Sequence, residues 1–296
     1  ALLAGAGVAI GVAWSGMLGN FAAGAFMLVL RPIKVGDFVG VGGLVGTVKE
    51  IGLFGTTIIT PDNVTLAMLE LAQVGPQDFV LDLGSGDGRI VILAARRFGA
   101  RGLGVEIVPE LVERSRRNAA QAGVAERAKF VEQDLFKTDL STASVVTMYL
   151  LQEVNLQLRP SLLRLKPGTR IVSHDWDMGD WRPDRSVTVD APDKPVGRDR
   201  RSQLHLWVVP ARAEGAWCGT GTHRDARLQL AQKHQVFDAM LSAGRSAQLL
   251  AGRIEGQWLR GAGGFDAVLE DGRLRIKQPG DAPASLAGAE LERCAA

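Results

Sequence analysis

Groups suited to metal binding or covalent catalysis are scarce in this chain of 296 residues. Its two cysteines, Cys218 and Cys294, lie far apart without the spacing of a zinc site or a disulfide framework, and its four histidines do not cluster. The pattern contains no Ser-His-Asp or Cys-His arrangement. The net charge of +2 comes without a basic stripe, so we expect no nucleic-acid partner and no bound metal.

Charge is absent from the start of the chain, because no Asp, Glu, Lys or Arg occurs between Ala1 and Leu30. A helix of that length, rising about 1.5 Å per residue, would cross the roughly 30 Å core of a bilayer. Arg31 and Lys34 follow at once, which favours a cytoplasmic location for that end. We therefore expect a transmembrane helix over residues 1–31 that enters the inner membrane through residues 1–30, with the rest of the chain in the cytoplasm.

Several motifs occur in this segment and just after it. They are Gly7–Ala13, Gly16–Asn20, Arg31–Asp37 and Gly46–Val48. Through them, residues 1–63 resemble the small-conductance mechanosensitive channel (MscS) family. The resemblance implies a pore helix that assembles into a homo-oligomeric ring, with Val8 and Val12 at a hydrophobic constriction and a kink near Gly16. A plain anchoring helix is the alternative.

β-Branched residues separated by glycines predict short strands over residues 37–39, 44–54 and 56–59. These strands would form a partial β domain over residues 32–62, of the kind that follows the pore helix in the channel family. Thr60–Val64 then suits both the last of these strands and the start of a helix. The chain therefore looks like a fusion of two unrelated genes.

The stretch Val80–Arg89 combines a hydrophobic strand, an acidic residue and three alternate glycines before a helical pattern. Such a turn lets backbone amides approach a ligand at a helix N-terminus. A dinucleotide site needs Gly or Ala where Arg89 stands, which disfavours NAD(P). The acidic-x-G-x-G-x-G form instead resembles the first motif of the class I S-adenosylmethionine (SAM) methyltransferases and implies SAM as the cofactor. A purely structural turn is the remaining alternative.

Strand and helix patterns alternate from Asp78 onward, which predicts an α/β domain with a doubly wound sheet over residues 63–210. We expect seven strands, over residues 79–83, 102–105, 129–132, 145–150, 170–174, 187–189 and 204–209. We expect helices over residues 89–98, 109–122 and 153–165. This succession resembles the class I methyltransferase plan.

Ligands bind beyond the carboxyl ends of the strands in such sheets, so the residues there are candidates for the cofactor site. The candidates are Asp82, Gly84, Ser85, Gly86, Gly88, Glu106, Asp134 and Leu135. The glycine turn would wrap the methionine and ribose portions of SAM. Glu106 would accept the ribose hydroxyls, and Asp134 would accept the adenine amino group with Leu135 packing nearby. A surface acid at a strand end is the alternative for each carboxylate.

The candidate catalytic residues are Tyr149, Asp175 and Trp181. Tyr149 ends the fourth strand, beside the expected position of the reactive methyl group. Asp175 would bind an amine acceptor as a cation, and aromatic faces such as Trp181 would add about 0.5–2 kcal/mol per contact. Core packing is the alternative for Tyr149 and Trp181.

A narrower resemblance rests on Asp82–Arg89, Asp134–Phe136, Ser144–Val146, Leu158–Leu165 and Trp181–Asp184. Through these motifs, residues 60–210 are similar to the ATP synthase c-subunit lysine methyltransferase family. The resemblance implies N-methylation of a protein lysine, with a small-molecule amine as the alternative acceptor. The chain departs from the animal members of that family over Tyr149–Asn155 and Ser173–Asp180.

After Pro210, short apolar runs between glycine-bearing turns predict a small antiparallel β appendage over residues 211–296, with a frayed end. Three functions then compete for the whole chain. It is a membrane-tethered SAM-dependent lysine methyltransferase, or a mechanosensitive channel subunit that carries a methyltransferase-like domain. The third alternative is a SAM-binding regulatory module without catalysis.

Overall fold

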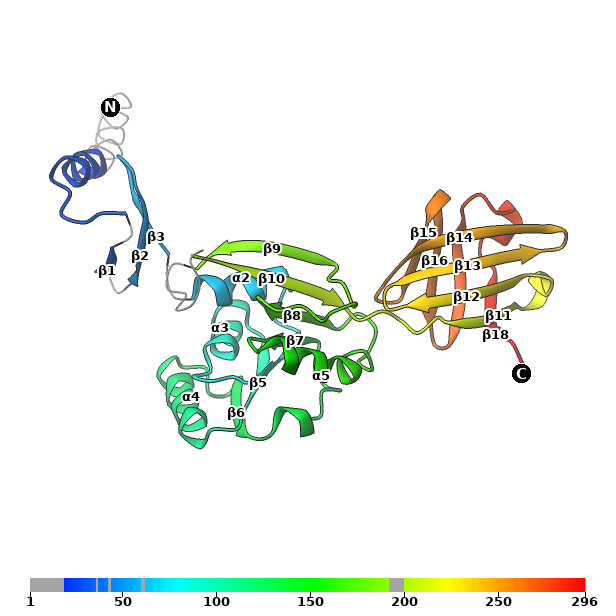
Figure 1. Ribbon diagram of the computed structural model, residues 1–296, viewed down its shortest axis with the longest axis horizontal. Coiled ribbons are helices and arrows are strands. Elements are labelled where there is room, and N and C mark those ends of the chain that lie inside the picture. Colours follow the sequence, from blue (N-terminus) through cyan, green and yellow to red (C-terminus); the bar gives the residue numbers. More distant parts are fainter. Residues whose placement is uncertain (1–18, 36, 42–43, 60–61, 192–199, 296) are drawn as a thin grey trace, which may run out of the picture. The chain divides into compact units, whose positions relative to one another are not determined.

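The computed structural model describes residues 19–295 apart from residue 36 and residues 42–43, 60–61 and 192–199. Two compact units divide the chain, one of residues 1–67 with 188–203 and one of residues 68–187 with 204–296. The strands belong to three sheets, which are a three-stranded sheet, a seven-stranded sheet and a closed barrel (Figure 1).

The N-terminal part contains a helix over residues 19–30. Among the described residues, no helix is both long and apolar enough to cross a bilayer. Residues 1–18, with the expected pore positions Val8, Val12 and Gly16, lie outside the described part of the chain.

The three-stranded sheet is an antiparallel meander of β1 (Phe38–Val41), β2 (Leu44–Ile51) and β3 (Thr56–Ile59), in that order. Its strands are rich in Val, Ile and Thr, which suit extended backbone. The strand expected over residues 44–54 ends at Ile51. It stops there because the N–H of Gly52 donates to the carbonyl of Gly55 at 2.9 Å and closes a turn.

The seven-stranded sheet confirms the predicted α/β architecture. Its strands are β4 (Phe79–Leu83), β5 (Arg101–Glu106), β6 (Ala128–Glu132), β7 (Val145–Met148), β8 (Arg170–His174), β9 (Arg185–Asp190) and β10 (Arg201–Val208). They lie in the order β6-β5-β4-β7-β8-β10-β9. Strands β4 to β8 pair in parallel, and β10 runs antiparallel to β8.

The strand order reverses between β4 and β7. Ligands of doubly wound sheets bind beyond the carboxyl ends of the strands at such a reversal, a region that we call the crevice. Four helices accompany the sheet, α2 (Asn63–Leu71), α3 (Arg89–Phe98), α4 (Pro109–Gln121) and α5 (Gln152–Leu162). Helix α3 begins directly after Gly88 and has no side-chain cap. The Arg89 N–H at its start donates to Asp87 Oδ1 at 3.3 Å. The N-terminus of a helix is also a place that favours a polar or negative ligand group.

Apolar residues of the central strands are buried, as expected for parallel strands covered on both faces. Leu81 and Leu83 of β4 and Val146 and Met148 of β7 are at most 1% exposed. They pack in one cluster with Leu158 of α5 and its neighbours. This core fixes the strand ends that carry the candidate site.

The C-terminal region is a closed barrel of eight antiparallel strands. The predicted antiparallel β structure is confirmed, whereas the expectation of a small appendage was wrong. The strands are β11 (Gly215–Gly219), β12 (Arg227–Lys233), β13 (Val236–Ala243), β14 (Ser246–Glu255), β15 (Trp258–Gly261), β16 (Phe265–Glu270), β17 (Arg273–Pro279) and β18 (Glu290–Arg293). Inward residues such as Trp217, Phe237 and Phe265 fill a separate hydrophobic core. Eight strands enclose an interior that side chains can fill, and here they do.

Closure of the barrel also corrects the interpretation of the cysteines and of the chain end. Cys218 and Cys294 form a disulfide across 76 residues of sequence. Strand β18 pairs with both β11 and β17 rather than fraying, and the Arg293 guanidinium lies 4.1 Å from the centre of the Trp217 ring. Spacing along the sequence could not indicate this pairing, because only the β11–β18 contact brings the two cysteines together.

Reduction of this disulfide is expected to loosen β18, because the unfolded chain would regain the entropy of a 76-residue loop. Such losses are typically about 2–4 kcal/mol. Hydrogen–deuterium exchange of the full chain with and without dithiothreitol measures the effect, and the Cys218→Ser/Cys294→Ser double variant is the matched control. Amides of β11 and β18 should exchange faster after reduction while those of β4 stay unchanged. Unaltered exchange in β18 would contradict the prediction.

Candidate functional site

The glycine turn after β4 has a backbone conformation that residues with a side chain rarely adopt. Gly84, Gly86 and Gly88 have φ values of 76°, 55° and 83°, in the left-handed region. A Cβ on Gly84 would lie 2.8 Å from Leu150, and one on Gly88 would lie 2.7 Å from both Phe130 and Ser115. A Cβ on Gly86 would meet nothing within 4 Å. Packing thus excludes a side chain at Gly88, whereas one at Gly84 would displace the tip of Leu150 and one at Gly86 would enter open space.

Asp82 lies below this turn as a buried carboxylate with one unsatisfied oxygen. It is 2% exposed, and its Oδ1 accepts a hydrogen bond of 2.7 Å from the Thr147 hydroxyl. Within the described residues, Asp82 Oδ2 and the buried Ser85 Oγ have no hydrogen-bond partner. Burial raises the pKa of Asp82 to about 7, with the negative charges of Asp87 and Glu106 adding to the effect and the Thr147 hydrogen bond opposing it. A positively charged ligand close to Oδ2 would stabilise the ionised form of this buried carboxylate.

Glu106 ends β5 and holds the turn from the other side. Its Oε2 accepts the N–H of Gly86 at 2.9 Å, and its Oε1 accepts the N–H groups of Ile107 and Val108 at 2.9 and 3.1 Å. The same carboxylate that is a candidate for the ribose hydroxyls therefore also fixes the open glycine. A glutamate in this position can organise the loop and still offer lone pairs to a ligand.

Asp134 and Leu135 follow β6. The Oδ1 of Asp134 accepts the N–H of Phe136 at 2.9 Å and caps a short 3₁₀ helix over Leu135–Lys137. Leu135 is partly buried against the core cluster of the sheet. Both residues lie at the carboxyl edge of the sheet, where the adenine of SAM is expected. Their role there stays a prediction.

The ends of β7 and β8 supply the other side of the crevice. The Tyr149 ring is 52% exposed and stacks on the buried His174 ring, with the ring centres 3.5 Å apart. Asp175 has a left-handed φ of 59° and places its Oδ2 3.5 Å from Nδ1 of His174. Burial and the charge of Asp175 raise the pKa of the Tyr149 hydroxyl, so this group stays neutral at physiological pH. Trp176, 42% exposed, follows in the same loop.

Trp181 does not join this cluster in the structure. It is 0% exposed, and its ring packs 6.1 Å from Trp207 and 6.0 Å from His234, centre to centre. The core-packing alternative therefore describes Trp181, and the structure gives it no access to an acceptor.

Sequence analysis missed three polar residues that support the site. Thr147, the one polar residue of β7, stands opposite Asp82 in the parallel register. Asn155 of α5 is fully buried and binds the loop after β8. His205 of β10 binds Ser186 Oγ at 2.8 Å, and burial lowers its pKa. The only signal in the sequence for Thr147 was a polar residue within an otherwise apolar run. The role of Asn155 follows only from the tertiary fold, and the sequence contains no signal for it.

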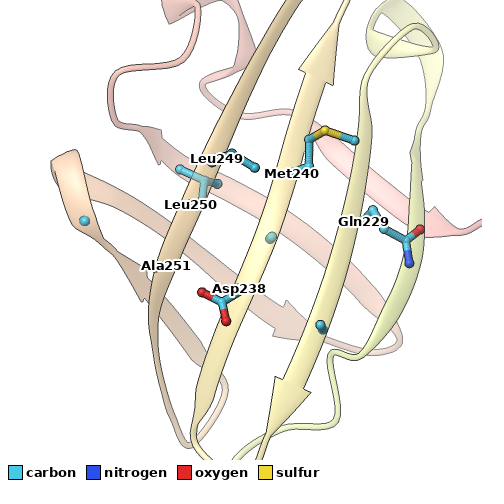
Figure 2. A pocket seen from close by; sticks show the side chains of 9 residues that line it. Gln229, Asp238, Met240, Leu249, Leu250 and Ala251 are labelled. Carbon is cyan, nitrogen blue, oxygen red and sulfur yellow. The ribbon is translucent and has the colours of Figure 1, made fainter.

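A second hollow lies on the outer face of the barrel, over β12, β13 and β14 (Figure 2). Its volume is about 530 Å³, and its lining includes Met240 and Leu249, the latter 82% exposed. Asp238 is the one carboxylate among the lining residues. Apart from Asp238, these lining side chains are apolar or carry an amide.

Comparison with known proteins agrees with the crevice of the seven-stranded sheet as the candidate site. Residues 82–185 match the family described as the ANTKMT methyltransferase domain. A protein-lysine N-methyltransferase of Saccharolobus islandicus is 45% identical over 133 residues, which are 44% of this chain and 83% of that relative. The mouse lysine N-methyltransferase of the ATP synthase c-subunit is 38% identical over 136 residues, and the match covers 44% of this chain and 55% of the mouse protein.

The fold, the glycine turn and these matches define a SAM-dependent methyltransferase, with SAM as its cofactor. More narrowly, the chain belongs to the methyltransferase family of the Saccharolobus enzyme, most of whose length it covers. A solved RNA methyltransferase of Salinibacter ruber, in complex with S-adenosylhomocysteine, is 50% identical to this chain. The match covers 52% of this chain and 95% of the Salinibacter chain, with a TM-score of 0.47.

The N-terminal segment has a different relationship. Residues 16–68 match the β-domain of mechanosensitive ion channels. A small-conductance mechanosensitive channel of Edwardsiella ictaluri is 48% identical over 58 residues, which are 20% of this chain and 20% of that channel. The two resemblances noted in the sequence, one to each family, are thereby confirmed.

Asp82 gives the ligand-free protein a defined pH dependence. Since burial raises its pKa from 3.8 to about 7, the folded state keeps a proton that the unfolded chain releases between these values. Its contribution to the free energy of unfolding is therefore largest below about pH 4 and falls as the pH rises to about 7. Asp82→Asn, which cannot ionise, should melt at a higher temperature than the unaltered protein at pH 8, with the gain fading toward pH 4.

Calorimetric unfolding of the full chain at several pH values measures this gain. The exposed Asp238→Asn on the barrel is the matched control, for which no such gain is expected. An Asp82→Asn variant whose melting temperature tracks that of the unaltered protein at every pH would contradict the assignment.

Proposed function

We propose that this protein transfers the methyl group of SAM to the Nζ atom of a protein lysine. The main support is an exposed aromatic ring and a carboxylate, Tyr149 and Asp175, which both lie against the His174 ring at the strand ends. Such a pair suits an alkylammonium chain, because the carboxylate attracts the charge and the ring offers a π face. The names of the Saccharolobus and mouse relatives point to the same acceptor class.

The residues on the cofactor side fit SAM by their chemistry. When bound, SAM supplies a methyl group on a positively charged sulfur. Gly84, Gly86 and Gly88 would bring the backbone close to its methionine and ribose portions, and Glu106 would accept from the ribose hydroxyls. Asp82, whose unpaired Oδ2 favours a nearby positive charge, would stabilise the cofactor electrostatically. Asp134 and Leu135 would hold the adenine.

The residues on the acceptor side would orient the lysine and then let it lose its proton. Asp175 would hold the ammonium group, and Asp177, whose Oδ1 accepts from Gln152 Nε2 and Gly179 N at 3.0 Å each, stabilises the same loop. The proton must leave for solvent before the nitrogen lone pair can form the new C–N bond, while the electron pair of the broken C–S bond stays on sulfur. Holding the two reactants in line is the main catalytic contribution expected of the protein.

The N-terminal segment is proposed to attach the enzyme to the inner membrane, with the methyltransferase domain in the cytoplasm. Support comes from the uncharged residues 1–30, from Arg31 and Lys34 after them, and from the match to a channel β-domain. Attachment would place membrane-bound protein lysines within reach. A small-molecule amine has no support from the names of the relatives.

A mechanosensitive channel subunit is the second candidate, favoured by that same match over residues 16–68. Survival of osmotic downshock by cells that lack their own channels tests it. Rescue by the full chain would support a transport function, and lysis at the rate of empty-vector cells would remove this candidate.

Methylation of protein lysines is testable without knowing the target. The full chain is incubated with methyl-labelled SAM and a cell lysate, and the modified residues are identified by mass spectrometry. We expect label on lysine Nζ, at least about tenfold less with Asp82→Ala or Glu106→Ala, since each removes a group from the cofactor site. The barrel variant Asp238→Asn should retain full activity. Label confined to nucleic acid or to small molecules would overturn the lysine assignment.

A further inference from the structure

We propose that Asn155 is a positioning residue that holds the acceptor side of the site in shape without touching either substrate. The inference rests on the proposed function, because an acceptor subsite must exist for Asn155 to position it. Asn155 lies on α5 and is 0% exposed, so its effect must pass through the loop that follows β8.

A closed set of hydrogen bonds connects Asn155 to that loop. Its Nδ2 donates to Ser173 Oγ at 2.9 Å and to the carbonyl of Trp176 at 3.2 Å. The Ser173 hydroxyl donates in turn to the same Trp176 carbonyl at 2.7 Å. The Trp176 N–H donates to the carbonyl of His174 at 2.7 Å, which tightens the turn between them. Asn155 thus ties together the two ends of the segment Ser173–Trp176.

The segment held in this way contains the strained residue of the acceptor side. Asp175 has a φ of 59°, a conformation that costs energy for a residue with a side chain. Left-handed backbone persists at such a residue only where the surroundings hold it. The amide of Asn155 and the hydroxyl of Ser173 are surroundings of that kind. They thereby direct the Asp175 carboxylate toward His174, on which the Tyr149 ring stacks.

Packing alone does not explain an asparagine at this buried position. A carbonyl such as that of Trp176 can only accept, so the donor end of the Asn155 amide must face it. The Oδ1 at the other end is buried and has no partner within the described residues. Burying an unpaired acceptor is unfavourable. We therefore attribute the asparagine at this position to the donor that its Nδ2 supplies to the turn.

The cofactor side offers a matched asparagine. Asn118 of α4 donates from Nδ2 to the backbone carbonyl of Asp87 at 2.9 Å, behind the glycine turn. Both asparagines therefore brace a loop at the crevice through a backbone carbonyl. Loss of Asn155 should disturb the acceptor side, whereas loss of Asn118 should disturb the cofactor side.

The test compares two ligands on the full chain by calorimetry. The first is S-adenosylhomocysteine. The second is an analogue with nitrogen in place of the sulfur, bearing an aminoalkyl arm of lysine length, so that it occupies both subsites at once. The ratio of the affinity for the second ligand to the affinity for the first reports the acceptor subsite alone. This ratio is measured for the unaltered protein and for four variants, Asn155→Asp, Asn155→Ala, Ser173→Ala and Asn118→Ala.

We expect Asn155→Asp, which keeps the shape but replaces the donor by an acceptor, to lower this ratio about tenfold, while the affinity for S-adenosylhomocysteine changes less than about twofold. Ser173→Ala should lower the ratio in the same direction and provides the measurement if the Asn155 variants fold poorly. Asn118→Ala should weaken both ligands in parallel and leave the ratio intact.

Three results would overturn the proposal. An unchanged ratio in both Asn155→Asp and Ser173→Ala would show that the turn does not depend on them. A parallel loss of both ligands in these variants would indicate a general structural role. The unaltered protein could also bind S-adenosylhomocysteine but bind the second ligand no more tightly. The proposed amine acceptor would then be wrong, and the proposed role of Asn155 would fail with it.

Discussion

The left-handed backbone of the glycine turn after β4 is the constraint on which the site depends. Gly84 and Gly88 let the turn pass against Leu150, Phe130 and Ser115, where any Cβ would collide. Gly86, between them, faces open space and is held by the Glu106 carboxylate. The N–H groups of Gly84 and Ser85 donate to the Val105 carbonyl, so hydrogen bonds as well as packing fix the turn before a ligand arrives. Helix α3 begins after Gly88, which has no side chain to supply a capping hydrogen bond.

The two sides of the crevice are built by different means. Backbone conformation shapes the cofactor side, with Asp82 buried beneath it and carrying an unpaired oxygen in a negative environment. Side-chain hydrogen bonds shape the acceptor side, where Asn155 and Ser173 hold the turn at Asp175. A backbone-built subsite tolerates few glycine substitutions, whereas a subsite built from side chains can be altered by single changes. This difference would allow related enzymes to share a cofactor and differ in acceptor.

Local features of the sequence predicted local features of the fold. The glycine turn, the strands of the seven-stranded sheet and the start of α4 at Pro109 all depend on neighbouring residues, and the structure confirms them. Barrel closure and the Cys218–Cys294 disulfide were missed because both depend on the pairing of strands far apart in the chain. Trp181 could not be assigned to core or site from its surroundings in sequence, since its burial comes from Trp207 and His234. Asn155 was overlooked for the same reason.

The central claim is that the crevice between β4 and β7 binds SAM on the glycine turn, with the acceptor side facing Tyr149 and Asp175. A crystal structure of the full chain with S-adenosylhomocysteine tests it most directly. The account predicts the ligand against Gly84–Gly88, its ribose hydroxyls within hydrogen-bond distance of Glu106, and its sulfur toward Tyr149. A ligand bound elsewhere, or one whose sulfur points away from Tyr149 and Asp175, would contradict it.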